Sequence, residues 1–181
     1  MRLAVLCTAV ALAASACAPP PPPPAPEAPP STAVRDSLKG AADMFMSNIT
    51  KAADQVPENL YAYKATPDVR SLGQLFAHVA DASFAICGAV SGEAAPEGSV
   101  EQTKTAKADI QQALTDAAAF CGRAFDSVND TTGADAVTLF GSINTTKLGA
   151  LGFNNAHNME HYGNIVTYMR LNKMVPPSSQ Q

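Results

Sequence analysis

The sequence predicts an all-α protein, a four-helix bundle whose helices follow one another in up-down-down-up order. Three observations predict this fold. Four segments of roughly 20 to 28 residues place apolar side chains at helical spacing, no segment alternates convincingly as a strand would, and two cysteines stand at similar depths in two of the segments. The chain of 181 residues is long enough for one such domain with appendages.

The first two helices have clear boundary signals. Residues 34–53 carry apolar side chains on one helical face, which predicts the first helix. Ser71, with Gln74 three residues later, forms a capping-box pattern that predicts the start of the second helix. The Ser91-Gly92 pair predicts its end, because glycine commonly follows the last turn of a helix.

The last two helices flank a polar stretch. A third helix is predicted over residues 103–128 and a fourth over residues 145–172, with Asn172 as its C-terminal cap. Residues 129–144 between them are polar and contain glycine, so we expect a loop here. The apolar residues of this loop must still pack somewhere, and they are Val137, Leu139 and Phe140.

Cys87 and Cys121 constrain the order of the helices. Cys87 lies 16 residues into the second predicted helix and Cys121 lies 18 residues into the third, or about 24 and 27 Å at 1.5 Å per residue. These depths match only if the two helices run parallel, and residues 91–102 are long enough to return along the bundle. We therefore predict a Cys87–Cys121 disulfide, with two buried free thiols as the alternative.

The N-terminal residues are typical of an exported lipoprotein. Residues 1–16 have a basic start, an apolar stretch and small residues at the end, which predicts a signal peptide. Cys17 follows directly and is the predicted lipidation site; ordinary cleavage that leaves a soluble secreted protein is the alternative. Residues 17–32 are mostly proline and alanine, which predicts an extended linker before a bundle over residues 33–179. We expect a periplasmic or cell-envelope location.

Three histidines are the candidate functional residues. His157 and His161 stand four residues apart, so one helical face carries both rings. His78 lies on the apolar face of the second predicted helix. Three imidazoles that converge from two helices would match a metal site with an open coordination position. The alternative is that each histidine is an ordinary core residue with its own hydrogen-bond partner.

Residues 157–161 also match the HxxEH pattern of one class of metalloproteases, in which the glutamate is the general base. That class takes its third ligand from a distant downstream glutamate, and the 20 residues after His161 contain no acid, so such a protease is excluded. Asn154, Glu160 and Tyr162 are weak candidates for residues that support the ligands. The alternatives are a polar helix residue, a solvated acid and a packed aromatic ring, respectively.

A resemblance to a known family rests on two segments, RSLGQLFAHVADA at residues 70–82 and HNMEHYGNIVTYMRLNKMVPPSS at residues 157–179. Together they resemble the DinB-like (YfiT-like) superfamily of metal-binding four-helix bundles, over about residues 34–179. The resemblance implies an up-down-down-up bundle with a three-histidine site for zinc, nickel or iron. The positions that match are His78, His157 and His161.

Characterised members of that superfamily include thiol-dependent S-transferases and a mycothiol-dependent isomerase, in which the metal activates a thiol. The resemblance implies a metal-dependent protein, a hydrolase or a thiol-dependent transferase with a divalent transition metal (Zn, Ni or Fe), and the predicted signal peptide adds that it is exported. The predicted export signal and disulfide depart from the cytoplasmic pattern of the family. The alternative function is non-enzymatic, a lipid-anchored metal-binding or envelope-stress protein.

The candidate partners follow from the same features. They are a membrane, through the lipid anchor, a small-molecule thiol, and a second copy of the chain in a homodimer. Nucleic acid is not an expected partner, because the chain has a net charge of −4 and lacks a Lys/Arg stripe.

Overall fold

Four long helices form the body of the protein in a computed structural model that describes residues 28–180. They are α1 (Ala33–Gln55), α2 (Leu72–Ser91), α4 (Lys107–Asp126) and α5 (Lys147–Leu171). The connections hold a short helix α3 (Val100–Thr103), strands β1 (Ala136–Leu139) and β2 (Ile143–Thr146), and single 3-10 turns at Glu58–Leu60, Thr132–Ala134 and Pro177–Ser179. The predicted signal peptide, Cys17 and residues 17–27 of the predicted linker lie outside the described residues.

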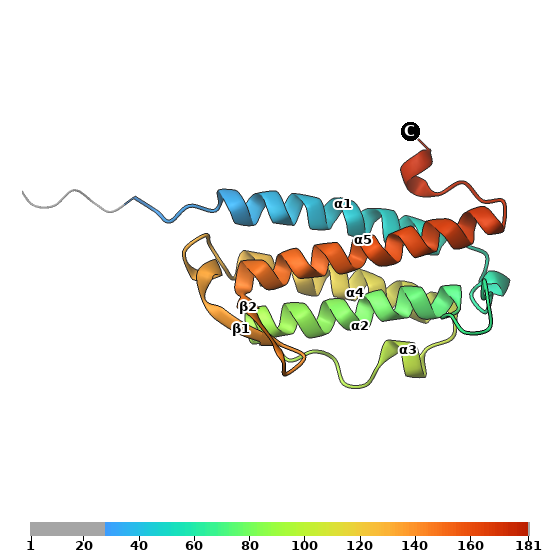
Figure 1. Cartoon of the computed structure of the whole chain (residues 1–181), viewed down its shortest axis with the longest axis horizontal. Coiled ribbons are helices and arrows are strands. Elements are labelled where there is room, and N and C mark those ends of the chain that lie inside the picture. Colours follow the sequence, from blue (N-terminus) through green and yellow to red (C-terminus); the bar gives the residue numbers. More distant parts are fainter. Residues whose placement is uncertain (1–27, 181) are drawn as a thin grey trace, which may run out of the picture.

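The long helices follow the predicted up-down-down-up order. Figure 1 shows α1 and α5 running in one direction and α2 and α4 running in the other, with the chain between α2 and α4 returning along the bundle. The Cys87–Cys121 disulfide joins α2 to α4 with the two Cα atoms 5.2 Å apart. Cys87 is the sixteenth residue of α2 and Cys121 the fifteenth of α4, so both helices start from the same end.

The boundaries of α2 have the predicted causes. The Ser71 hydroxyl accepts a hydrogen bond from the Gln74 backbone N–H, and the Gln74 side chain accepts one from the Ser71 N–H, so the capping box is complete. Gly92 ends the helix in the left-handed conformation with φ 76°, which costs glycine little. Asn172 stands at the C-terminal cap of α5, also as predicted.

Helix α2 is the central core helix. It is long and apolar enough to cross a membrane by length and composition, but 67% of its most apolar stretch is buried inside the bundle. Burial of large side chains such as Leu72 and Phe76, each contributing about 1.5–3 kcal/mol, explains why α2 lies between α4 and α5. This packing holds the α2 face that carries His78 against α5.

The third predicted helix is wrong at its start. The structure has the separate helix α3 at Val100–Thr103, an extended break at Lys104, and then α4 from Lys107. Asp81 of α2 causes the break, because its carboxylate accepts hydrogen bonds from the Ser99 hydroxyl (2.7 Å) and the Val100 and Glu101 N–H groups (2.7 and 3.0 Å). These bonds hold α3 against α2, so the chain must turn before α4 can begin.

The loop predicted over residues 129–144 is also wrong in part, because it contains a β-hairpin. Strand β1 pairs antiparallel with β2. Leu139, the last residue of β1, is fully buried in the core. The turn has positive φ at Phe140 and Gly141, a geometry that usually selects Asn-Gly. The sequence has Phe-Gly at these two positions, so it lacks the usual Asn-Gly signal for a hairpin. Phe140 itself is 58% exposed, and its ring packs edge-on against that of Phe153, with the ring centroids 6.5 Å apart.

Candidate metal centre

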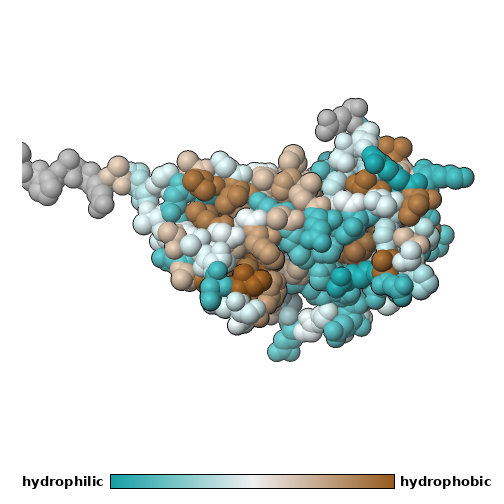
Figure 2. Space-filling view, in the orientation of Figure 1, coloured by the Kyte–Doolittle hydropathy of each residue, from teal (hydrophilic) through white to brown (hydrophobic). Residues whose placement is uncertain are grey.

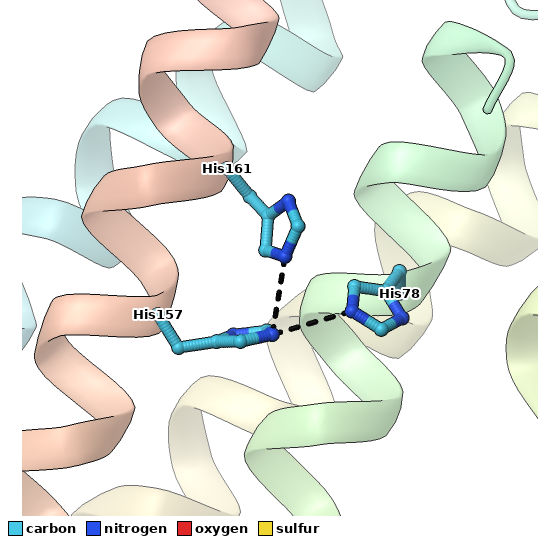
Figure 3. A group of neighbouring side chains, drawn as sticks. All are labelled: His78, His157 and His161. Atoms are coloured by element: carbon cyan, nitrogen blue, oxygen red, sulfur yellow. Dashed lines mark hydrogen bonds between the residues drawn. The ribbon is translucent and has the colours of Figure 1, made fainter. Parts of the chain in front are cut away.

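The three predicted histidines converge. His157 and His161 project from α5 and His78 projects from α2, and the rings point toward one another (Figure 3). The Nε2 atom of His157 lies 3.2 Å from Nε2 of His78 and 3.1 Å from Nε2 of His161. One ligand nitrogen from each ring lies within 4.8 Å of the other two. The three residues therefore form a single candidate metal centre.

The spacing of these nitrogens fits a metal ion. Two nitrogens bound at about 2.05 Å to a tetrahedral zinc ion are about 3.3 Å apart, close to the two measured separations. The Nδ1 atoms of His157 and His161 are buried and have no hydrogen-bond partner within the described part of the chain. Among residues 28–180, the polar contacts of these two rings are therefore the Nε2···Nε2 approaches, whereas an ordinary core histidine would hydrogen-bond to another group of the protein. The donor set suits a divalent ion with one open position.

The surroundings of His157 and His161 favour the neutral form of both rings. His161 is 8% exposed, and its burial, together with the neighbouring rings of His157 and His78, lowers its pKa to about 4. Burial also lowers the pKa of His157, and the His78 ring adds to that effect. A neutral imidazole retains a lone pair for a metal, so the site is suited to binding at neutral pH.

Glu101 is a site residue that sequence reasoning missed. Its Oε2 atom lies 3.1 Å from Nδ1 of His78, and its Oε1 atom accepts a hydrogen bond of 2.8 Å from Nε of Arg70. A carboxylate at Nδ1 directs the ring proton there and leaves Nε2 free for a metal. The sequence does contain a signal for α3, the helix that carries Glu101. Ser99 and Gln102 repeat the capping pattern of α2, and the Ser99 hydroxyl does cap α3.

Replacing Glu101 with glutamine is expected to weaken metal binding about 10- to 100-fold, the usual cost of losing a partner that orients a ligand. The amide keeps the size of the side chain but loses the charge that holds His78. Competition with a chromophoric chelator measures the dissociation constant. Glu97→Gln, an exposed acid outside the centre, is the matched control. Equal affinity in wild type and Glu101→Gln would show that the carboxylate does not orient His78.

Asp81→Ala is expected to weaken metal binding by a factor similar to that of Glu101→Gln, although Asp81 forms no hydrogen bond or ion pair with a histidine among the described residues. The three hydrogen bonds that hold α3 are lost, so Glu101 is no longer positioned. The test is the double variant, because residues that act in one chain of contacts are not additive. The double variant Asp81→Ala/Glu101→Gln should bind metal about as tightly as whichever single variant has the lower affinity. A loss equal to the product of both factors would contradict the coupling.

The three weak candidates do not support the ligands directly. Asn154 is buried but contacts the disulfide, with its Nδ2 3.9 and 3.8 Å from the sulfurs of Cys87 and Cys121. The Tyr162 hydroxyl accepts a hydrogen bond from the N–H of Ser178, in the C-terminal turn Pro177–Ser179. Glu160 is exposed, and it forms no hydrogen bond with a histidine in the structure of residues 28–180.

A cleft of about 590 Å³ adjoins the centre. His161 contributes to its wall, and Glu160 is another of its lining residues. The remaining lining residues come from the segment before α2 and from α2, α3 and α5: Asp68, Val69, Arg70, Leu75, Glu101, Asn164 and Tyr168. A small molecule in this cleft would lie beside His161.

The family can now be assigned. The family model described as the DinB superfamily matches residues 41–165, more than two thirds of the chain. This chain belongs to the DinB superfamily. The family match confirms the resemblance noted from the sequence, although no curated protein sequence matches the chain.

Solved structures show the DinB fold directly. A DinB-like protein from Bacillus cereus ATCC 10987 is similar with a TM-score of 0.68 and 15% identity, over 78% of this chain and 95% of that one. A DinB-like protein from Bacillus subtilis gives 0.63 and 15%, over 80% and 99%. A mycothiol-dependent maleylpyruvate isomerase gives 0.59 and 13%, over 72% of this chain and 60% of that one. At these identities the likeness establishes the fold alone.

Proposed function

We propose that this DinB-superfamily protein is an exported metal-dependent enzyme, a hydrolase or a thiol-dependent transferase. The observation that carries the proposal is the convergence of three Nε2 atoms beside a cleft lined by His161. A divalent metal at these nitrogens (Zn, Ni or Fe) would lower the pKa of a thiol or water at the remaining position.

Residues of the chain would orient the site and shape the cleft. Glu101 fixes the proton of His78 on Nδ1. The Tyr168 hydroxyl donates a 2.8 Å hydrogen bond to the carbonyl of Arg70, which ties the segment before α2 to α5 across the cleft. Leu75 and Tyr168 are buried apolar walls that exclude water from one side of a bound molecule. Substrate would therefore meet the histidines in a partly dry pocket.

Two observations support the finer parts of the proposal. The structural likeness to a mycothiol-dependent maleylpyruvate isomerase favours a thiol as the activated group. The buried Cys87–Cys121 disulfide favours an oxidising compartment, in agreement with the predicted signal peptide and lipidated Cys17. Intact mass spectrometry of the mature protein tests the export proposal, since an unmodified Cys17 would contradict the lipid anchor.

The enzyme proposal is tested in two stages. Purified protein is first loaded with Zn²⁺, Ni²⁺ or Fe²⁺, and bound metal is counted against a His157→Ala control. Loaded protein is then assayed for transfer of a thiol to an aryl halide and for hydrolysis of a nitrophenyl ester. A rate above that of His157→Ala in either assay supports the enzyme. Bound metal without any such rate would favour the lipid-anchored metal-binding or envelope-stress protein instead.

A further inference from the structure

The side chains that line the cleft beside His161 carry unbalanced negative charge before the charge of a bound metal is counted. Its carboxylates are those of Asp68, Glu101 and Glu160, and its one strong cation is Arg70. The Arg70 guanidinium already pairs with Glu101, Nε to Oε1 at 2.8 Å. Across residues 28–180, neither Asp68 nor Glu160 forms an ion pair. Two carboxylates therefore remain available to a molecule in the cleft.

These carboxylates lie near the candidate metal centre. Glu160 directly precedes His161 on α5, and both residues line the cleft. Asp68 stands on the segment before α2, which Tyr168 ties to α5. A ligand whose donor atom sits at His161 would have its other end beside this acidic lining, because His161, Asp68 and Glu160 line the same cleft.

Polar and apolar groups in the cleft restrict the ligand further. The His161 side chain is more than nine-tenths buried, and its Nδ1 atom meets no partner in the described range of the chain. Leu75 and Tyr168 are 5% and 6% exposed and give the cleft an apolar wall. Figure 2 shows hydrophilic surface, with apolar side chains interspersed, over the part of this face where α2 begins. The lining thus combines a short apolar wall with free carboxylates.

We infer that the cleft selects small cationic ligands, in which a positively charged amine is joined by a short apolar body to a thiol. The thiol faces the histidines and the ammonium group faces Asp68 and Glu160. Small thiols that end in a carboxylate are disfavoured, because like charges repel in a partly buried cleft. This inference rests on the proposed function, since the metal centre holds the sulfur.

The test compares three thiols of similar size on zinc-loaded wild-type protein by isothermal titration calorimetry. Cysteamine is cationic, 2-mercaptoethanol is neutral and 3-mercaptopropionate is anionic. At low salt we expect cysteamine to bind about 5-fold more tightly than 2-mercaptoethanol, and 3-mercaptopropionate to bind more weakly still. The preference should shrink in 0.5 M salt, because exposed charges are screened at roughly 4 Å there.

Charge-removing variants assign the preference to the cleft. Asp68→Asn/Glu160→Gln should bring cysteamine and 2-mercaptoethanol to nearly equal affinity while zinc content is unchanged. Glu58→Gln, an exposed acid outside the cleft, should keep the wild-type preference. Zinc-loaded protein that binds 3-mercaptopropionate as tightly as cysteamine, or a preference unaffected by the double variant, overturns the inference and leaves the metal-dependent function standing. Protein that binds no zinc, nickel or iron overturns both.

Discussion

Replacing His157 with alanine is expected to weaken metal binding by more than about 100-fold, beyond the cost of losing a residue that only orients a ligand. His157 is the central ring, because its Nε2 is the atom within 3.2 Å of His78 and within 3.1 Å of His161. Its removal leaves two nitrogens, which is fewer than the three that catalytic zinc sites use.

The measurement is metal content after dialysis, together with the dissociation constant from chelator competition. Met159→Ala is the matched control, because Met159 is 39% exposed on the same helix and lies outside the centre. The metal-free variant should melt close to metal-free wild type, because His157 is only partly buried and its Nδ1 has no partner to lose within the described residues. Full metal occupancy in His157→Ala would contradict the three-histidine centre.

Replacing both Cys87 and Cys121 with alanine is expected to lower the free energy of unfolding by about 3–4 kcal/mol. The bridge closes a loop with a sequence separation of 34, and the entropy of that loop in the unfolded chain accounts for this magnitude. For a domain of this size the melting temperature should fall by roughly 10 °C. The loss concerns stability alone, because Asn154 separates the disulfide from the histidines along α5.

Urea denaturation of four samples isolates the cross-link. Wild type and the double alanine variant are each measured with and without reductant. Reduction should destabilise wild type and leave the variant unchanged, which separates the lost bridge from the small cavities that alanine creates. Metal affinity should be similar in all folded samples. A wild-type midpoint that does not respond to full reduction would contradict a stabilising role for the bridge.

Much of the fold was predictable because its signals are local. The spacing of apolar residues marks a helix wherever the segment lies in the fold, and the caps at Ser71 and Gly92 act within one turn. The two cysteines added a long-range constraint, since a disulfide demands close Cα atoms, and they predicted the parallel pair α2 and α4. The candidate pair His157 and His161 was predictable for a similar reason, because one helical turn separates the two residues.

The errors arise where a distant residue decides the local conformation. The predicted third helix is interrupted at residues 104–106 because Asp81, on another helix, binds the N–H groups at the start of α3. The hairpin forms around a Phe-Gly turn because Leu139 is buried in the core, although the turn sequence gives little local signal. Asn154 lies on the same helix as His157 and His161 but faces the disulfide. The packing of α2 and α4 against α5 decides which residues contact each turn of α5.

The sequence by itself therefore determined the four helices, the order in which they run, the disulfide and the three histidines that converge. The tertiary structure alone decided which residues complete the centre: Glu101 at His78, Asp81 behind it, and an acidic cleft at His161. The physical reason is that helix periodicity and caps act over a few residues, which a sequence displays. Hydrogen bonds to a ring nitrogen and the charge balance of a cleft depend on segments that meet only after the bundle has packed.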